Sequence, residues 1–549
     1  MNLSNKLRRI TRQARDRHLP LPGMRMMGWL KFITFAAVVC LAAIPLSVSA
    51  IVYQPPAGTS MWDTWMFCEG KDAHLFYLRS EVGKEHWNSI GHAVSQDLVH
   101  WKELPPIPAK GAEGSWDHAP TLTGCTVKRG DTYYLFYGAA NPRQQVGVMT
   151  SKDLIHWQKE AGNPVLESRP PLYGDGFDWR DLSAYFDAAE QQWHGVICAR
   201  AGSEHTAANP SPNPSRDAKR GQPAIGHLVS SDLLHWEQRP PLFTSWRWSN
   251  TEVPEAFTLG GKHYLLFSNG GSLPETSGRK KAGGTFYLMA DKFEGPYRIP
   301  EEPLLLGWGG GHLDNYVGRV VRYRGELLLY HHTCGGPVKN DHPEDPKGLR
   351  GLSASTPWQP GVGGPVTWGA PKSVQQRADG SLWLKYWPGM DQLERRLLFD
   401  GAPPQAVGEE AVRWLPVQAA DLSIVLRFSV EKDASPVGLI WRWNGMRGGA
   451  VSVQPSDNKV AIGELSAEGA AAPEMKSHDE IISASAGAGE HLLRVLVRGH
   501  RAEVYLDERW LFATPTLGNG GASGKVGFLT SSRAELRNVR VAELEPLQQ

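Results

Sequence analysis

Ser-Gln-Asp-Leu-Val-His-Trp, at residues 95–101, is the stretch that decides the fold, because the chain contains it three times. It recurs as Ser-Lys-Asp-Leu-Ile-His-Trp at 151–157 and as Ser-Ser-Asp-Leu-Leu-His-Trp at 230–236. Self-similarity of this kind predicts a repeat architecture, and units of several short strands are typical of propeller blades. We expect the repeated Asp to cap a turn and the Trp to pack between blades, so that the three His residues do not form a metal site.

Residues 51–375 have the pattern of an all-β domain. Apolar and aromatic runs of strand length alternate with turns rich in Gly, Pro, Asn and Asp. The stretch 206–221 is rich in Ala, Asn, Pro and Ser, and we expect it to be an insertion loop. Five units can be counted by their central strands, at 73–78, 132–137, 192–198, 262–267 and 326–330. The pattern therefore predicts an N-terminal five-bladed β-propeller.

A second domain is expected, because 549 residues are too many for one hydrophobic core. Residues 376–400 are expected to be a connector. Short β runs separated by turns fill 401–549, which predicts a C-terminal β-sandwich of lectin or jelly-roll type. Within it, 464–488 is low in aromatic residues and rich in Ala, Glu and Ser, so we expect a surface loop there.

The N-terminal segment 1–50 has the pattern of a secretory signal. A basic region is followed by an apolar run at 32–46 and by small residues up to Ala50, where cleavage is expected. This predicts a secreted or periplasmic protein, with an uncleaved membrane anchor as the alternative. After export, the remaining four cysteines could form up to two disulfides. No cysteines or histidines are spaced as they are in a metal site. The four cysteines are Cys68, Cys125, Cys198 and Cys334.

Composition narrows the range of partners. The 58 Lys and Arg nearly balance the 57 Asp and Glu, which leaves no electrostatic footprint for nucleic acid. The 21 Trp suit sugar binding, because an aromatic face packs well on the apolar face of a sugar ring. We therefore expect an oligosaccharide or polysaccharide partner, and contact with a membrane only if the N-terminal segment is uncleaved. The oligomeric state is left open.

Three acidic residues stand at the starts of predicted blades, where core packing does not need them. Asp63 opens the first unit, Asp181 the third and Glu252 the fourth. Each acid taken alone could equally be a turn or capping residue. Their common place on the strands next to the propeller axis predicts that they form one site.

The residues around these acids resemble the clan of glycosidases that includes families 32, 68 and 43, and family 32 most closely. Trp-Asp-Thr-Trp at 62–65 is similar to the nucleophile motif of fructan-active enzymes, in the form found in levansucrases. Arg-Asp at 180–181 resembles their Arg-Asp-Pro motif, and Thr-Glu-Val-Pro at 251–254 their Glu-Cys-Pro motif. Leu182 replaces the proline of the second motif and Val253 the cysteine of the third.

The resemblance assigns a role to each residue of these motifs. Asp63 is expected to be the nucleophile and Glu252 the acid/base, the two carboxyl groups that glycosidic cleavage requires. Asp181 is expected to hold sugar hydroxyls and stabilise the transition state, with Arg180 orienting it. A raised pKa for the acid/base would come from burial beside another carboxylate, such as Glu255 or Asp181.

Further candidates for substrate contact lie on the same strand starts. Asp117 and His118 could bind substrate or only brace the start of the second blade. His312 and Asp314 could contact a ligand on the axis or partner a central cation, or form a structural polar cluster. Several tryptophans could wall the pocket or simply fill the core. The full set of substrate-binding candidates is Trp62, Trp65, Trp116, Asp117, His118, Arg180, Glu255, His312 and Asp314, with Trp179, Trp246 and Trp248 as further possible wall residues.

The resemblance implies an exported glycoside hydrolase that cleaves furanosidic linkages, most closely β-fructofuranosides, by a retaining two-carboxylate mechanism. No organic cofactor and no metal are expected. One competing hypothesis is a family 43-like arabinofuranosidase or xylosidase that inverts, with carboxyl groups about 6.5–9.5 Å apart instead of about 5 Å. A carbohydrate-binding protein without activity is a second, and a transglycosylase is a third.

Overall fold

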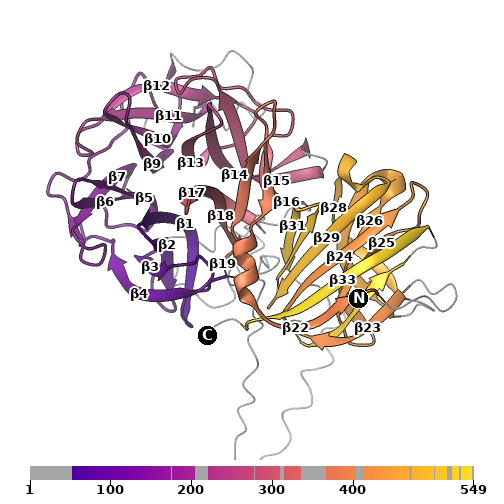
Figure 1. The fold of residues 1–549 in the computed structure, drawn as a ribbon. Coiled ribbons are helices and arrows are strands. Elements are labelled where there is room, and N and C mark those ends of the chain that lie inside the picture. Colours follow the sequence, from indigo (N-terminus) through magenta and orange to yellow (C-terminus); the bar gives the residue numbers. More distant parts are fainter. Residues whose placement is uncertain are drawn as a thin grey trace, which may run out of the picture. The chain divides into compact units, whose positions relative to one another are not determined.

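The computed structural model contains a propeller and a sandwich, both built almost entirely of β-strands (Figure 1). No helix in the part of the chain that the structure describes is long and apolar enough to cross a membrane. The described residues are 52–174, 176–203, 221–276, 279–309, 315–334, 366–403, 412–468, 473–499, 501–515, 522–530 and 533–546. The predicted signal segment 1–50, all but the last residue of the predicted insertion 206–221, and His312 and Asp314 lie outside them.

Four blades of the propeller are four-stranded antiparallel sheets in chain order. The first contains β1 (Thr59–Glu69), β2 (Asp72–Glu81), β3 (Ser89–Ser95) and β4 (Trp101–Pro108). The second contains β5 (Thr121–Arg129), β6 (Thr132–Ala140), β7 (Gln144–Ser151) and β8 (Gln158–Lys159). The third contains β9 (Trp179–Asp187), β10 (Gln192–Arg200), β11 (Pro223–Ser230) and β12 (Glu237–Thr244). The fourth contains β13 (Glu252–Leu259), β14 (Lys262–Thr276), β15 (Arg279–Ala290) and β16 (Leu304–Gly309).

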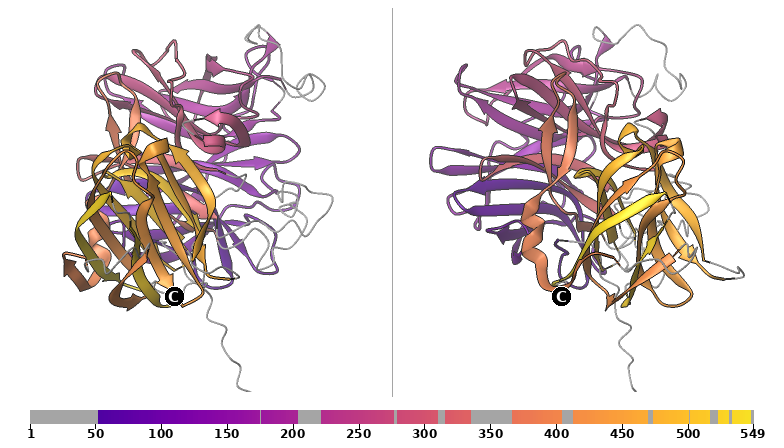
Figure 2. Two further views of the ribbon diagram at one scale, coloured as in Figure 1. Left: turned by 90° about the vertical axis from the view of Figure 1, so that its right-hand side faces the viewer. Right: turned by 45° about the vertical axis from the view of Figure 1, so that its right-hand side comes forward.

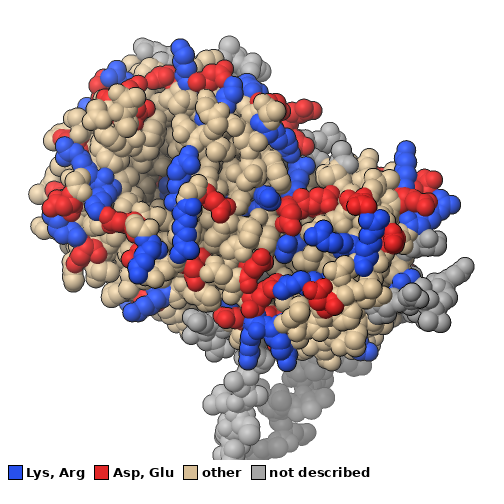
Figure 3. All heavy atoms as spheres, in the orientation of Figure 1, with Lys and Arg blue, Asp and Glu red and all other residues tan. Residues whose placement is uncertain are grey.

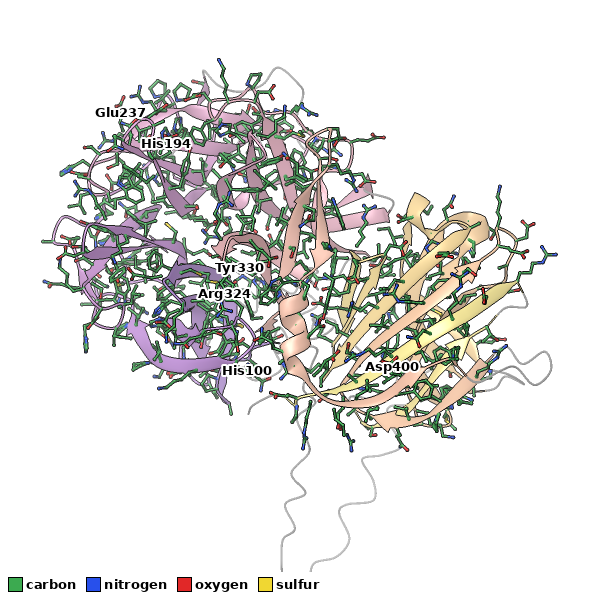
Figure 4. All side chains as sticks on the ribbon, in the orientation of Figure 1. His100, His194, Glu237, Arg324, Tyr330 and Asp400 are labelled. Carbon is green, nitrogen blue, oxygen red and sulfur yellow. The ribbon has the colours of Figure 1, made fainter. Side chains whose placement is uncertain are left out.

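The fifth blade closes the ring. It contains β17 (Asn315–Tyr323), β18 (Glu326–Cys334), β20 (Lys372–Gln376) and β21 (Leu382–Tyr386), and the short β19 (Val366–Trp368) also pairs with β18. The inner strands β1, β5, β9, β13 and β17 contact one another in that order, and β17 also contacts β1. The Tyr330 hydroxyl of β18 accepts a hydrogen bond from the backbone N–H of Met66 in β1, at 2.9 Å (Figure 4). The expectation of a five-bladed propeller is thereby confirmed.

The repeated stretch is a turn between the last two strands of a blade. In the first copy, the backbone N–H groups of Val99 and His100 donate to the Asp97 carboxylate at 3.0 and 2.8 Å. The Trp101 indole N–H donates to the carbonyl of Leu98 at 3.2 Å. The other two copies repeat these bonds. The capping role predicted for the repeated Asp is confirmed, and each His is held by its own Asp.

The sandwich consists of two sheets around a second hydrophobic core. One sheet runs β31 (Arg509–Pro515), β30 (Arg501–Leu506), β29 (Gly489–Arg498), β24 (Leu422–Val430), β33 (Ala534–Leu544) and β22 (Glu394–Gly401). The other runs β23 (Val412–Ala419), β32 (Gly524–Leu529), β25 (Val437–Trp443), β26 (Arg447–Gln454), β27 (Lys459–Ser466) and β28 (Glu474–Ile482). Figure 2 shows these strands face to face from two further sides.

Two stretches differ from what their composition suggested. The loop expected at 464–488 holds the whole of β28, an edge strand whose side chains are largely exposed, so the strand has no apolar pattern in the sequence. The segment 376–400 contains β21, the short 3-10 helix η4 (Pro388–Leu393) and most of β22. The fifth blade and the sandwich thus follow each other with no irregular linker between them.

The cysteines that the structure describes do not form the two disulfides that were considered. Cys68, Cys125 and Cys198 are free thiols. Burial raises the pKa of Cys68 and of Cys125 to about 12, so both stay protonated and unreactive near neutral pH. Positive and negative side chains are interspersed over the face of the molecule that Figure 3 shows.

Candidate active site

The inner strands carry a β-bulge at the level of the predicted acids. Pairing shifts register at Asp63 in β1, next to Asp181 in β9 and just after Glu252 in β13. Asp181 and Val253 have left-handed backbones, with φ of 60° and 47°. A bulge re-aims the side chain that it carries and is common beside active sites. The face shown in Figure 3 is hollowed near β9 and β13, whose positions Figure 1 labels.

Asp63 is buried with half of its carboxylate unpartnered. The Thr123 hydroxyl donates a hydrogen bond to Oδ2, whereas Oδ1 has no hydrogen-bond partner. Burial raises the pKa of Asp63 to about 8, helped by the charges of Asp181 and Glu252 and opposed by Thr123 and Arg180. The free Oδ1 therefore belongs to a carboxyl group whose charge is costly in these surroundings.

Asp181 is held from two sides. The backbone N–H of Val253 donates to its Oδ2 at 3.1 Å, and the Arg180 Nε lies 3.3 Å from the same oxygen. Burial raises the pKa of Asp181 to about 6, against the lowering effect of Arg180. The bulge in β13 supplies the backbone donor, so one blade positions the acid of its neighbour.

Glu252 completes the group of acids. Arg180 donates from Nη2 to its Oε1 at 2.9 Å, and the Tyr316 hydroxyl donates to its Oε2. The Glu252 side chain keeps 27% of its surface exposed, more than the side chains of Asp63 and Asp181. It is thus the carboxyl group of the three that solvent or a leaving group reaches most easily. Arg180 joins Asp181 and Glu252 in a single network.

A fourth carboxylate, Asp178, holds Arg180 of this network in place. It accepts hydrogen bonds from Arg180 and from Arg200. Burial alone would raise the pKa of Asp178, but the two guanidinium groups outweigh it and hold that pKa below its ordinary value. Arg200 is anchored by the carbonyl of Ser249 at 2.9 Å. Asp178 therefore stays charged and fixes the direction of Arg180, a role that the sequence analysis did not assign to it.

An aromatic cluster lies against Asp63. The Trp62 ring packs 4.7 Å from the His332 ring and 6.4 Å from the Tyr316 ring, measured between centroids. Nδ1 of His332 lies 4.0 Å from Oδ1 of Asp63. Sequence reasoning placed Trp62 at the site but missed Tyr316 and His332. Tyr316 follows two residues after the candidate Asp314, whereas nothing in the local pattern singles out His332.

The structure places several other candidates away from this cluster. Trp65 is buried between the first two blades, where its indole N–H donates to the Thr126 hydroxyl at 3.1 Å, which favours core packing over a place in the pocket wall. Trp179 and Trp248 are likewise buried in core clusters. Glu255 pairs with Arg319, whose Nε donates to it at 3.0 Å, instead of lying against Glu252.

The candidates that open the second blade contact residues of that blade and of the loop before it. Asp117 accepts hydrogen bonds from Lys159 and, at 2.9 Å, from the Tyr137 hydroxyl. Burial would raise the pKa of Asp117, but these bonds hold it below the ordinary value. His118 lies 3.1 Å from the carbonyl of Gly111, and Trp116 packs on Tyr137. These contacts favour the bracing role for Asp117 and His118. Among the described residues, no group of three His, Cys, Asp or Glu could hold a metal ion.

Known sequences match part of this chain. The model of the glycosyl hydrolases family 32 N-terminal domain matches residues 64–208. A sucrose-6-phosphate hydrolase of Zymomonas mobilis is 29% identical over 254 residues, which are 42% of this chain and 44% of that protein. A sucrose:sucrose 1-fructosyltransferase of Festuca arundinacea is 33% identical over 144 residues, 24% of this chain and 21% of that one. The chain thus spans less than half the length of these relatives.

Solved structures share the whole architecture. A family 32 β-fructofuranosidase of Bombyx mori superposes with a TM-score of 0.64 at 19% identity, covering 91% of this chain and 95% of that one. Fructan 1-exohydrolase IIa of Cichorium intybus gives a TM-score of 0.66 at 14% identity, covering 92% and 98%. The chain therefore has the fold of these propeller glycosidases, a five-bladed propeller followed by a β-sandwich. Residues 64–208 are similar to the N-terminal domain of glycosyl hydrolase family 32.

Proposed function

We propose that the protein hydrolyses β-fructofuranosides by a retaining double displacement. The observation that carries the proposal is the single network in which Arg180 joins Asp181 to Glu252, together with Asp63 on β1, which lies close enough for the charges of both acids to raise its pKa. The matched proteins, which are named as hydrolases and transferases of fructosyl groups, support the choice of sugar.

In the proposed mechanism the free oxygen of Asp63 attacks the anomeric carbon. Glu252 first protonates the departing oxygen and then removes a proton from the incoming water. Asp181 binds hydroxyl groups of the fructosyl unit, and its charge stabilises the positive character of the transition state. Arg180 is a positioning residue that keeps Asp181 and Glu252 in place, since it bonds both.

We also infer that the protein is exported. The basic residues before an apolar run, and the small residues ending at Ala50, support removal of the segment 1–50 by a signal peptidase. Sequencing the N-terminus of the protein recovered from culture medium or periplasm tests this, with a start at Ile51 as the expected result.

The decisive experiment measures the sugar released by purified protein from sucrose, levan, inulin, arabinan and xylo-oligosaccharides. Fructose is expected, and Asp63→Asn should reduce its release by at least about a thousandfold, because the variant lacks the nucleophile. Pentose release would instead indicate a family 43-like activity, and binding without release a carbohydrate-binding protein. A fully active Asp63→Asn protein would contradict the site assignment.

Glu252→Gln separates the roles of the two acids in the same assay. It should depress hydrolysis of sucrose far more than hydrolysis of an aryl fructoside, because a good leaving group needs no proton. Equal losses on both substrates would count against an acid role for Glu252. Formation of longer fructans at high sucrose concentration would favour the transferase activity that the similarity to fructosyltransferases suggests.

A further inference from the structure

In the candidate site, atoms of two buried polar side chains, Asp63 and His332, lie near each other without hydrogen-bond partners. Oδ1 of Asp63 has no partner, and neither ring nitrogen of His332 has one. The closest approach is 4.0 Å, between Nδ1 of His332 and Oδ1 of Asp63. His332 is fully buried. Buried polar atoms have hydrogen-bond partners in the great majority of cases. Two buried side chains that lack such partners at the same place therefore suggest that a ligand atom bonds to them.

The distance between these atoms suits a shared third atom. A separation of 4.0 Å is too long for a direct hydrogen bond. An oxygen atom can nevertheless lie about 2.8 Å from both groups at once and bond to each of them. Burial lowers the pKa of His332 to about 3, so the imidazole is neutral and offers one donor and one acceptor nitrogen. A hydroxyl group, which can both donate and accept, is complementary to such a pair.

The ring of His332 is already fixed in place. Its centroid lies 4.7 Å from that of Trp62 and 5.9 Å from that of Tyr316. Tyr316 is itself held by its hydrogen bond to Glu252. Little rotational freedom therefore remains for His332 to lose when a ligand binds, which favours a specific contact.

The position of the pair indicates which part of a sugar it meets. Oδ2 of Asp63 is occupied by Thr123, so the unpartnered Oδ1 is the oxygen free to attack the anomeric carbon. A group beside Oδ1 therefore lies near the substituents of that carbon and of its neighbours. In a fructosyl unit these are the hydroxyl groups on carbons 1 and 3, and an aldofuranoside lacks the exocyclic hydroxymethyl group at its anomeric carbon.

We propose that His332 is a specificity-determining residue that, together with Oδ1 of Asp63, binds the hydroxyl group next to the reacting carbon of the fructosyl unit. This inference rests on the proposed function. It adds a substrate contact from the second strand of the fifth blade, β18, to the acids supplied by the first, third and fourth blades.

The experiment compares three substrates: p-nitrophenyl β-D-fructofuranoside and its 1-deoxy and 3-deoxy analogues. On the parent compound, His332→Phe is expected to lower kcat/KM by about tenfold to a hundredfold, because the variant loses a hydrogen bond in a dry site. On the analogue that lacks the bound hydroxyl, wild type and His332→Phe should agree within about twofold. His332→Gln, which keeps an amide donor and acceptor, should retain most of the wild-type preference for the parent.

A matched control is His92→Phe. His92 is a buried histidine of the first blade that stacks on Phe76, with centroids 4.5 Å apart, and lies within hydrogen-bond distance of His74, outside the site. This variant should leave the ratios among the three substrates unchanged even if its stability falls. If His332→Phe does not fold, the substrate ratios of His332→Gln and of wild type still provide the test.

Uniform losses of kcat/KM across all three substrates in either His332 variant would overturn the inference, as would an unchanged kcat/KM of His332→Phe on the parent compound. These outcomes leave the proposed function standing, because wild-type turnover is measured in the same series. A wild type that releases p-nitrophenol from no fructoside would overturn the proposed function itself, and this inference with it.

Discussion

Asp63 combines two properties that oppose each other, burial and a charge required for attack. Its pKa lies near 8 because burial and two neighbouring carboxylates disfavour the anion, against an ordinary value of 3.8. Between these two pH values the folded state binds a proton that the unfolded state has lost. The contribution of Asp63 to stability is therefore greatest below about pH 4 and falls as the pH rises to about 8.

Asp63→Asn should consequently stabilise the fold in a pH-dependent manner. The melting temperature of the variant is expected to exceed that of wild type by a margin that grows from pH 5 to pH 8, to at least about 2 °C, and then levels off. Thermal unfolding followed by circular dichroism measures this. The control is Asp117→Asn, which should lower the melting temperature, because the pKa of Asp117 is depressed by its partners. A margin for Asp63→Asn that did not change with pH would contradict the raised pKa.

Among the structural elements, the three copies of the repeated turn differ in one contact. In each copy the His Nδ1 lies 2.7 Å from its own Asp. His100, which Figure 4 labels, is the one of these three that also lies 3.1 Å from Glu545, the residue after β33 of the sandwich. Its side chain is 39% exposed, against 87% for His156 and 88% for His235. His100 thus links the first copy of the turn to the residue that follows the last strand of the sandwich.

His100→Ala should therefore cost more stability than the same change in the other two copies. Desolvation opposes the charge of His100, but Asp97 and Glu545 outweigh it and raise the pKa of its imidazole. The resulting stabilisation is present in full below about pH 6.5 and is lost as the pH rises through the raised pKa. We expect a loss of about 0.2–1 kcal/mol at pH 5.5, the usual range for a partly exposed pair. Urea unfolding at pH 5.5 and pH 8.5 measures it, and equal losses in all three copies would contradict the special role of His100.

Element boundaries were predictable only where packing imposes a pattern. The central strands of the blades are apolar because they are buried between neighbouring blades, so their positions were clear from the sequence. β28 is an exposed edge strand, and its alternation is weak because few of its side chains need burial. β21 was assigned to a connector, although the turn that pairs it with β20 contains Asp379-Gly380, a dipeptide typical of hairpins that the sequence analysis did not use.

In the molecule as a whole, a buried ion pair joins the fifth blade to the sandwich. Lys372 of β20 is fully buried, and its Nζ lies 3.1 Å from the Glu503 carboxylate of β30. The same ammonium group donates to the carbonyl of Ala370 at 2.6 Å and lies 3.0 Å from Nε2 of His331. The Tyr505 hydroxyl donates to Glu503 at 2.7 Å.

Lys372→Met should be strongly destabilising, because it leaves Glu503 buried without its partner. A loss of about 3–5 kcal/mol is expected, and Lys372→Met combined with Glu503→Gln should recover most of it. Equilibrium urea unfolding measures both proteins. A double variant no more stable than the single one would show that the cost arises from packing and not from the unpaired charge.

The residues that contact this junction between the fifth blade and the sandwich are sequence neighbours of two site residues. His331 precedes His332, and Asn315, which donates to the carbonyl of Ala513 at 2.7 Å, precedes Tyr316. The sandwich therefore fixes the two strands of the fifth blade that carry these site residues. This gives the second domain a structural role at the site, whether or not it binds sugar.

Repeats, strand patterns and short motifs are local properties of the chain, and they were enough to predict the all-β class, the five blades, the following sandwich and the three acids. The side chains that join those acids became known only from the folded ring. Tyr316 and His332 reach the site because the ring closes, whereas Glu255 turns to Arg319 and Trp65 enters the core. Such contacts link strands far apart in sequence and depend on bulges and ring closure, which leave no local pattern.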